Sequence, residues 1–322
     1  MKNKVLILTN TKDGIHTDSV VDHLIKAGEN VARINTDLIP GGKLSLEYVS
    51  KDSKSEWRLY GESVDVSSGE IKSIWYRRPN DFNFSLKDPQ QNLFAMKELG
   101  IILNGLWYTA GDVLWINSPA NLELARNKLH QLQLAKKLGL ITPETIVTND
   151  PVSVSKFVGR FEKVVTKTLY QCFLDYGDSQ YNALTTVVEQ RHLDNLDLVK
   201  VLPAMFQEYI KKAYELRVTI VGEKVFATKI ESQQLPETSI DWRHPKYIGS
   251  LPHTAIQLPV AIEQACLGMM RLYGLKFGAF DLVVCPDGEH IFLELNPNGQ
   301  WYWIEHLTGQ QISKSIAKLL AC

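Results

Sequence analysis

Asp281, Glu294 and Asn296 are the residues whose types and spacing best suit metal chemistry. Asp281 lies in one apolar run and the other two lie in the next, with the turn sequence Pro286-Asp287-Gly288 between the runs. Alternate residues of a strand share a face, and a hairpin folded at this turn brings Asp281 beside them. Three oxygen-bearing side chains would then hold Mg²⁺, completed by phosphate oxygens and water. This predicts a nucleoside triphosphate as partner; the alternative is that the carboxylates are ordinary solvated strand residues.

Charged residues on two preceding apolar runs follow the order that a nucleotide site needs. The strand-like run Met205–Ile210 leads to Glu215 and Arg217, which share a face of the next expected strand. A glycine turn should then return Lys229 to the same sheet. Carboxylates bond ribose hydroxyls, the backbone of a connecting segment can read adenine edges, and Arg and Lys pair with phosphate oxygens. No Walker loop and no GxGxxG follows a strand, which leaves an ATP site built between two sheets.

Composition sets broad limits. A chain of 322 residues predicts roughly two to three domains. Hydrophobic content of 44% and charged content of 22% are typical of a soluble globular protein, and a net charge of −1 gives no reason to expect nucleic-acid or membrane binding. We find no signal peptide, no membrane span and no CxxC pair among the four cysteines. The expected location is cytoplasmic.

The elements expected around these residues form an α/β pattern. Strand, helix and strand at 5–8, 16–27 and 31–34 predict a parallel α/β domain, and a strand at 74–79 ends in Arg77 and Arg78. Ser118-Pro119 is a helix entry signal, so we place a domain boundary between 117 and 118. One amphipathic helix is expected up to Gly139, with Lys128 near its start. Lys163–Lys167 should be a strand, and Tyr170–Tyr181 a mobile loop that closes over a nucleotide.

Five segments in order resemble the ATP-grasp ligases, and more narrowly the microviridin-type (graspetide) peptide maturases. They are WYRRP at 75–79, ARNKLHQLQLAKKLGL at 125–140, FQEYIKKAYELRVTIVGEKVFATKIESQQL at 206–235, DWR at 241–243 and GAFDLVVCPDGEHIFLELNPNGQW at 278–301. The resemblance implies an α/β ATP-grasp fold that holds the nucleotide between two sheets. It divides the chain into a pre-ATP-grasp domain (1–117), a central domain with a lid loop and a peptide-docking helix (118–204) and an ATP-grasp domain with a magnesium site (205–322).

The resemblance also implies roles for individual residues. Lys128 and Lys167 match lysines that hold ATP phosphates, Glu215 the acid that binds ribose, and Arg217 an arginine that faces the phosphates. The magnesium ligands are Asp281, Glu294 and Asn296. The adenine connector is Gln207, Glu208, Tyr209 and Ile210, with backbone groups of Glu208 and Ile210 as contacts.

Two further charged pairs are candidates for catalysis. Arg77 and Arg78 follow Trp-Tyr at a strand end and suit carboxylate or phosphate binding, although they could be a surface pair. Asp241 and Arg243 lie in an expected loop and could simply pair with each other.

The implied reaction is activation of a carboxylate. The γ-phosphoryl group of ATP passes to an Asp or Glu side chain of a peptide, and a Ser or Thr hydroxyl or a Lys amine attacks the acyl phosphate. ADP and phosphate are released. In such maturases a leader segment of the precursor peptide docks on the enzyme. Here the matching stretch carries Arg191, His192, Asp194 and Asn195, basic at two positions where the microviridin branch is acidic, so we expect a different leader.

Three expectations remain open at this stage. A RimK-like or glutathione-synthetase-like amino-acid ligase would share every ATP residue named above. A non-catalytic ATP-binding module is a second alternative, disfavoured because it would have little use for a complete magnesium site. We also expect a homodimer.

Overall fold

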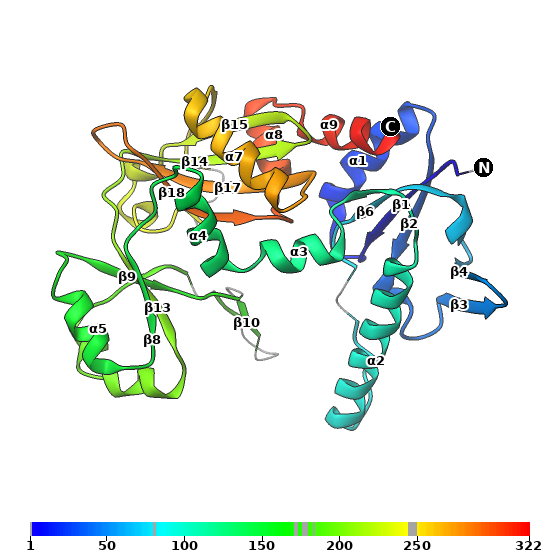
Figure 1. Ribbon diagram of the computed structural model, residues 1–322, viewed down its shortest axis with the longest axis horizontal. Coiled ribbons are helices and arrows are strands. Elements are labelled where there is room, and N and C mark those ends of the chain that lie inside the picture. Colours follow the sequence, from blue (N-terminus) through cyan, green and yellow to red (C-terminus); the bar gives the residue numbers. More distant parts are fainter. Residues whose placement is uncertain (1, 80–81, 171–172, 176–179, 183, 244–249) are drawn as a thin grey trace.

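The computed structural model describes residues 2–79, 82–170, 173–175, 180–182, 184–243 and 250–322. Five β-sheets and the helices around them make up this part of the chain (Figure 1). Within these ranges no helix is long and apolar enough to cross a lipid bilayer.

The first sheet is parallel and has the strand order β2-β1-β6-β7. Its strands are β1 (Lys4–Thr9), β2 (Asn30–Asn35), β6 (Ile71–Tyr76) and β7 (Leu114–Ile116). Helices α1 (Gly14–Lys26) and α2 (Pro89–Tyr108) and an antiparallel meander of β3 (Leu44–Lys51), β4 (Lys54–Gly61) and β5 (Val64–Ser67) complete this region. Strand β6 ends at Tyr76, so the predicted strand exists but stops before Arg77 and Arg78, which follow it.

The C-terminal helix α9 (Ile312–Ala321) returns to this first sheet and lies beside α1 (Figure 1). Val5, Trp75, Trp301 and Ile316 share one buried cluster, and the hydroxyl of Ser73 donates to the carbonyl of Leu320 at 2.7 Å. The two ends of the chain therefore have a common core.

The second sheet is antiparallel, in the order β12-β9-β13-β8. It contains β8 (Thr145–Thr148), β9 (Val164–Lys167), β12 (Thr186–Val187) and β13 (Ala204–Glu208), next to α5 (Pro151–Val158), α6 (Gln190–Leu193) and the 3₁₀ helix η3 (Leu196–Val201). The segment Tyr170–Tyr181, expected to be a mobile loop, contributes two paired strands, β10 (Phe173–Asp175) and β11 (Gln180–Asn182). Residues 171–172 and 176–179 of that segment lie outside the described ranges.

The third sheet is antiparallel, in the order β16-β15-β14-β17-β18. Its strands are β14 (Tyr214–Val221), β15 (Lys224–Ile230), β16 (His253–Ile256), β17 (Phe277–Val284) and β18 (His290–Asn296). The short elements η4 (Ser232–Gln234), η5 (Pro236–Thr238) and α8 (Tyr302–Thr308) flank it.

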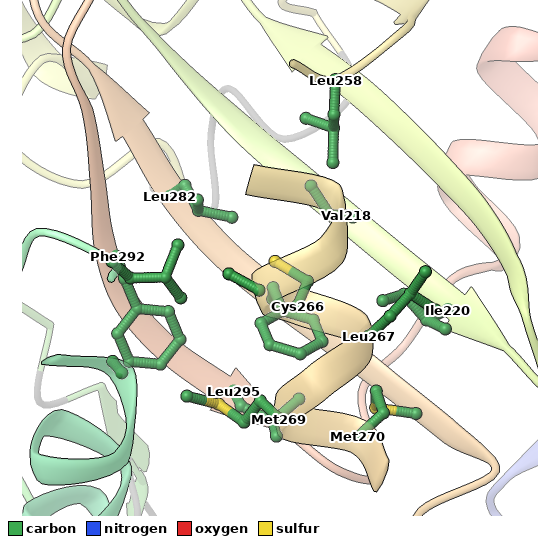
Figure 2. Packing of buried hydrophobic residues seen from close by; sticks show 14 of the residues in the cluster. Val218, Ile220, Leu258, Cys266, Leu267, Met269, Met270, Leu282, Phe292 and Leu295 are labelled. Atoms are coloured by element: carbon green, nitrogen blue, oxygen red, sulfur yellow. The ribbon is translucent and has the colours of Figure 1, made fainter. Parts of the chain in front are cut away.

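Helix α7 (Val260–Leu272) packs on one face of the third sheet (Figure 2). Val218, Leu282 and Phe292 from the sheet meet Cys266 and Met269 from the helix, and all five are buried. Burying one such large apolar side chain stabilises the fold by roughly 1.5–3 kcal/mol. Because side chains alternate along a strand, this apolar face leaves Glu215, Arg217 and Asp281 on the other face.

The predicted single helix up to Gly139 is wrong. The structure has two helices, α3 (Pro119–Ala125) and α4 (Lys128–Lys137). The side chain of Asn127 accepts a hydrogen bond from the backbone N–H of His130 at 3.0 Å and so caps α4. Lys128 thus becomes the first residue of a new helix. The apolar stripe hid this break, because it continues across both helices.

Candidate active site

One large cleft, of about 1030 Å³, lies between the second and third sheets and reaches the first. Lys167 and Gln207 line it from the second sheet, Asp281 and Glu294 from the third, and Arg78 from the end of β6. The predicted site between two sheets therefore exists as a cavity.

Asp281 and Glu294 face each other across the β17–β18 ladder. Each carboxylate is held by a cation. Arg217 Nη1 donates to both oxygens of Asp281 at 2.7 and 2.8 Å, and Lys128 Nζ lies 3.0 Å from Glu294 Oε2. Burial raises the pKa of Asp281, against the effect of Arg217. Burial acts in the same sense on Glu294, but Lys128 and Lys167 outweigh it and bring its pKa to about 2.

The donor set suits a hard cation. The described residues contain no group of three His, Cys, Asp or Glu side chains that could hold a metal, so any set here is two carboxylates and one amide. Asn296 lies two residues beyond Glu294 and its Oδ1 accepts from the N–H of Asn298 at 3.1 Å. Carboxylate and amide oxygens are what Mg²⁺ binds, usually with phosphate oxygens and water. These three residues therefore fit the ion.

The connector after β13 presents a backbone donor to the cleft. Glu208 N–H donates to the carbonyl of Glu144, and Tyr209 N–H to that of Lys163, each at 3.0 Å. The N–H of Ile210 makes no hydrogen bond within the described part of the chain, and Ile210 lines the cleft. The side chain of Gln207 is buried.

Glu215 is buried and paired with a lysine that the sequence analysis missed. Lys212 Nζ donates to Glu215 Oε1 at 2.7 Å and to the carbonyl of Ile240 at 2.8 Å. Burial raises the pKa of Glu215, and Lys212 opposes this. The sequence signal for this pair was a lysine three residues before the acidic residue of the expected strand.

Lys167 lines the same cleft from the end of β9. Burial lowers the pKa of its amine, while Glu294 raises it. An amine in this position is suited to binding an anion, which would restore its charged form.

Asp241 and Arg243 pair with each other, which is the simpler of the two predicted outcomes. Arg243 Nε and Nη2 donate to the two oxygens of Asp241 at 2.8 and 2.6 Å. Burial alone would raise the pKa of Asp241, but the hydrogen bonds from Arg243 bring it to about 2. Both residues line the cleft.

Arg77 has a different place from the one predicted. Its side chain is 0% exposed; Nε donates to Asp13 Oδ2 at 3.1 Å, and the guanidinium lies over the ring of Trp301 at 4.8 Å. Burial lowers its pKa to about 10. The guanidinium is therefore largely enclosed by protein, although Arg77 is among the residues that line the cleft. Direct binding of a ligand carboxylate or phosphate by Arg77 stays a prediction. Arg78 also lines the cleft and is 42% exposed.

Lys229 is not among the residues that line the cleft. It pairs in register with Leu216, whose side chain lies in the apolar core on the α7 side of the sheet. Its amine is 2.6 Å from Glu231 Oε1 and lies over the ring of Tyr214. The strand was predicted correctly, but its register puts Lys229 on the face opposite Glu215 and Arg217.

The four residues expected to meet a leader peptide lie on or next to α6, outside the residues that line the cleft. Arg191 Nε is 2.9 Å from Glu189 Oε2, and His192 Nδ1 accepts from the N–H of Glu189 at 2.9 Å. Asp194 accepts from Gln190 at 2.9 Å, and Asn195 donates to the carbonyl of Arg191 at 2.8 Å. These hydrogen bonds are exposed and join residues close in the chain. They do not test the docking role, which stays a prediction.

Gln131 and Asn117 also support the site and were not predicted. Gln131 is buried, and its amide both donates to the carbonyl of Leu295 at 2.7 Å and accepts from the N–H of Leu295 at 2.8 Å. Asn117 Nδ2 donates to the carbonyls of Phe277 and Pro297 at 2.8 and 2.9 Å. Both amides fix the backbone beside the acidic residues. A lone polar residue on an apolar stripe was the only sequence signal for Gln131.

An antiparallel sheet that carries acidic residues, facing a second antiparallel sheet across a cleft lined with lysines, defines the ATP-grasp class of enzyme. Residues 4–123 match the model of the MvdD pre-ATP-grasp domain, and residues 125–320 match that of the RimK-like ATP-grasp domain. No curated protein matches the sequence.

Solved structures resemble the chain over its whole length. One is the RiPP-associated ATP-grasp ligase of Chryseobacterium gregarium in complex with ADP and a leader and core peptide, at 33% identity and a TM-score of 0.91, covering 99% of this chain and 96% of that one. The macrocyclase MdnC of Microcystis aeruginosa, bound with its precursor peptide MdnA, has 31% identity and a TM-score of 0.88, covering 98% and 99%. MdnB of the same organism has 30% identity and a TM-score of 0.84, covering 99% of both. The chain belongs to the RiPP-associated ATP-grasp ligases, enzymes that modify ribosomally made peptides.

Proposed function

We propose that this protein is an ATP-dependent peptide macrocyclase. The observation that carries the proposal is the pair of facing carboxylates, Asp281 and Glu294, held by Arg217 and Lys128 inside one cleft between two sheets. Two similar structures support the proposal. MdnC and the Chryseobacterium ligase resemble this chain over its whole length, and both were solved with peptides bound.

The proposed reaction has two steps. A side-chain carboxylate of an Asp or Glu in the precursor attacks the γ-phosphorus of ATP, so that an acyl phosphate forms as ADP leaves. A Ser or Thr hydroxyl or a Lys amine of the same peptide then attacks the acyl carbon, loses its proton and expels phosphate. The peptide loses one water molecule for each ester or amide bond that forms. No covalent enzyme intermediate is needed, and the chain contributes positioning and charge.

We assign the binding of ATP to residues that line or border the cleft. Lys128, Lys167 and Arg217 would hold phosphate oxygens, Glu215 would bond the ribose hydroxyls, and the free N–H of Ile210 would donate to adenine. Asp281, Glu294 and Asn296 would hold Mg²⁺, which when bound neutralises phosphate charge. Arg243, held by Asp241, adds a further positive charge.

Four further features remain proposals. The precursor would dock its leader at α6, through the stretch that contains Arg191 and Asp194. The domain division at 117/118 and 204/205 is proposed on the family resemblance, and a homodimeric state and a cytoplasmic location are proposed as well. Light scattering of the purified protein tests the dimer.

The alternatives predict different products. A RimK-like or glutathione-synthetase-like ligase would add an amino acid to its acceptor, and a non-catalytic module would bind ATP without turnover. The similarity to peptide ligases over the full chain length disfavours both.

The test is incubation of the protein with the precursor peptide, ATP and Mg²⁺, followed by mass spectrometry. We expect one ADP released for each water lost from the peptide, and none when Glu294→Gln replaces the parent. A peptide mass that rises by one amino acid would establish the RimK-like alternative. ADP release without any change in peptide mass would reject the macrocyclase.

A further inference from the structure

Two arginines, Arg78 after β6 and Arg126 after α3, lack a close carboxylate partner among the described residues. Arg126 is the C-cap residue of α3, and its backbone N–H donates to the carbonyl of Leu122 at 3.0 Å. Its side chain makes no hydrogen bond or ion pair to a described residue. Arg78 Nε is 3.8 Å from Asp13 Oδ1, and that carboxylate already binds Arg77 at 3.1 Å. Both Arg78 and Arg126 line the cleft.

Other cations around the cleft are compensated. Lys128 pairs with Glu294, Lys212 with Glu215, and Arg243 with Asp241, at distances of 3.0, 2.7 and 2.6 Å. The charge of Glu294 acts on the amine of Lys167, which lies at the proposed phosphate site. The excess positive charge of the cleft is therefore at Arg78 and Arg126. Glu123, three residues before Arg126, is a carboxylate that also lines the cleft.

Both guanidinium groups start from fixed backbone. The N–H of Arg78 donates to the carbonyl of Leu8 at 3.2 Å, and its own carbonyl accepts from Asn10 Nδ2 at 2.8 Å. Arg126 occupies the break between α3 and α4, where Asn127 caps the second helix. Arginines mounted in this way can bind a carboxylate through two parallel bonds at little entropic cost.

Arg126 is also close in the chain to the proposed phosphate site. Arg126 precedes Lys128 by two residues, and Lys128 contacts Glu294. The cleft volume, about 1030 Å³, is at the upper limit of the roughly 300–1,000 Å³ typical of small-molecule sites, so a nucleotide leaves room for part of a second ligand.

We infer that Arg78 and Arg126 form the subsite for the acidic side chain of the peptide, holding its carboxylate toward the phosphate end of the nucleotide. This inference rests on the proposed function for the identity of the anion. From its place after Trp-Tyr, Arg78 was expected to bind a carboxylate or phosphate, whereas no sequence pattern indicated a role for Arg126.

The test measures binding and not turnover. The probes are a synthetic peptide of alternating Thr and Glu, and the same peptide with Gln for every Glu, titrated by fluorescence anisotropy in the presence of ADP and Mg²⁺. We expect the parent to bind the Glu peptide about tenfold or more tightly than the Gln peptide, since hydrogen bonds to charged groups are worth that much. Arg78→Gln and Arg126→Gln should each reduce this preference, and the double variant should abolish it.

The matched control is Arg33→Gln, which removes a half-buried arginine that pairs with Asp18 outside the cleft. It should keep the preference, and all variants should keep the melting temperature and ADP affinity of the parent. Equal binding of both peptides by the parent, or an unchanged preference in the double variant, would overturn the subsite. Failure of the parent to dehydrate any precursor would reject the macrocyclase, and the binding preference would still decide the subsite.

Discussion

Arg77 and Asn298 are hydrogen-bonded in both directions. Asn298 Nδ2 donates to the carbonyl of Arg77, and Arg77 Nη1 donates to the carbonyl and Oδ1 of Asn298 at 2.8 and 3.0 Å. Asn298 in turn donates its N–H to Asn296 Oδ1. Two successive hydrogen bonds therefore connect the buried Arg77, which follows strand β6, to Asn296, a proposed magnesium ligand.

The loop after β18 is held at successive carbonyls. Asn117 bonds that of Pro297, Arg77 those of Asn298 and Gly299, and Arg217 that of Gln300. A backbone fixed at four consecutive residues can hold a ligand side chain to the tolerance that catalysis needs.

We predict that Asn298→Ala lowers kcat/KM by about tenfold, since small displacements of positioning groups are costly. The Mg²⁺ concentration for half-maximal activity should rise, and amide hydrogen exchange at 296–301 should accelerate in the protein without ligands. Asn83→Ala, which loses one exposed bond to Ser85, is the control. Unchanged exchange in Asn298→Ala would contradict the tether.

The two acidic strand residues should differ in their effect on stability. Asp281→Ala leaves Arg217 buried without its carboxylate, at a cost of roughly 3–5 kcal/mol, whereas Glu294→Gln leaves Lys128 bonded to the carbonyl of Thr168. Both substitutions should lower turnover about 10²-fold or more. Thermal denaturation with and without Mg²⁺ checks this, because only the parent should gain stability from the ion. Turnover within a few-fold of the parent in both variants would remove the metal assignment.

The sequence predicted the facing of Asp281 and Glu294 correctly, because strand alternation and a Pro-Asp-Gly turn are local signals. It also predicted the shared face of Glu215 and Arg217. Burial of Arg77 and the contacts of Asn298 depend on residues about 220 positions apart, which no local pattern reports. Lys229 was misplaced because the face of β15 depends on its register with β14, and a strand pattern alone leaves that register undetermined.

Glu215 should set the preference for a ribose 2′-hydroxyl. We predict that the parent favours ATP over 2′-deoxy-ATP, and that Glu215→Gln reduces this preference by about five- to tenfold, as expected for hydrogen bonds to a charged acceptor. The measurement is the affinity for each nucleotide by calorimetry. Glu223→Gln, an exposed acid near Arg271, should retain the preference. Equal affinities in the parent would place the ribose elsewhere.

Acid should weaken the junction between the first sheet and the chain's C-terminal part through His16. Burial first, and then the charge of Arg77, lower the pKa of His16 from 6.5 to about 4, with Asp13 acting in the opposite sense. Between these values the unfolded chain binds more protons than the folded one, so stability falls as pH decreases from 6.5 to 4. The pKa values near 2 of Asp241 and Glu294 extend this loss to lower pH.

The check on His16 is the melting temperature as a function of pH. His16→Asn retains an acceptor for the N–H of Tyr302 and cannot titrate, so its curve should be flatter than that of the parent between pH 6.5 and 4. Parallel curves over that range would show that other groups cause the acid sensitivity.

The last prediction concerns leader choice. Charges at an interface affect partner selection more than raw affinity, and Arg191 is 72% exposed at the surface of α6 even though Glu189 contacts it. We predict that the protein prefers a leader with an acidic or apolar residue at this contact over a microviridin-type leader. Arg191→Glu should reverse that preference, and Arg160→Glu, on an exposed arginine near α5 that pairs with Glu144, should not. Anisotropy titrations with both leaders measure the effect. Tight binding of the microviridin leader by the parent, or no response to Arg191→Glu, would show that the leader docks elsewhere, because a contact at Arg191 cannot be indifferent to reversal of its charge.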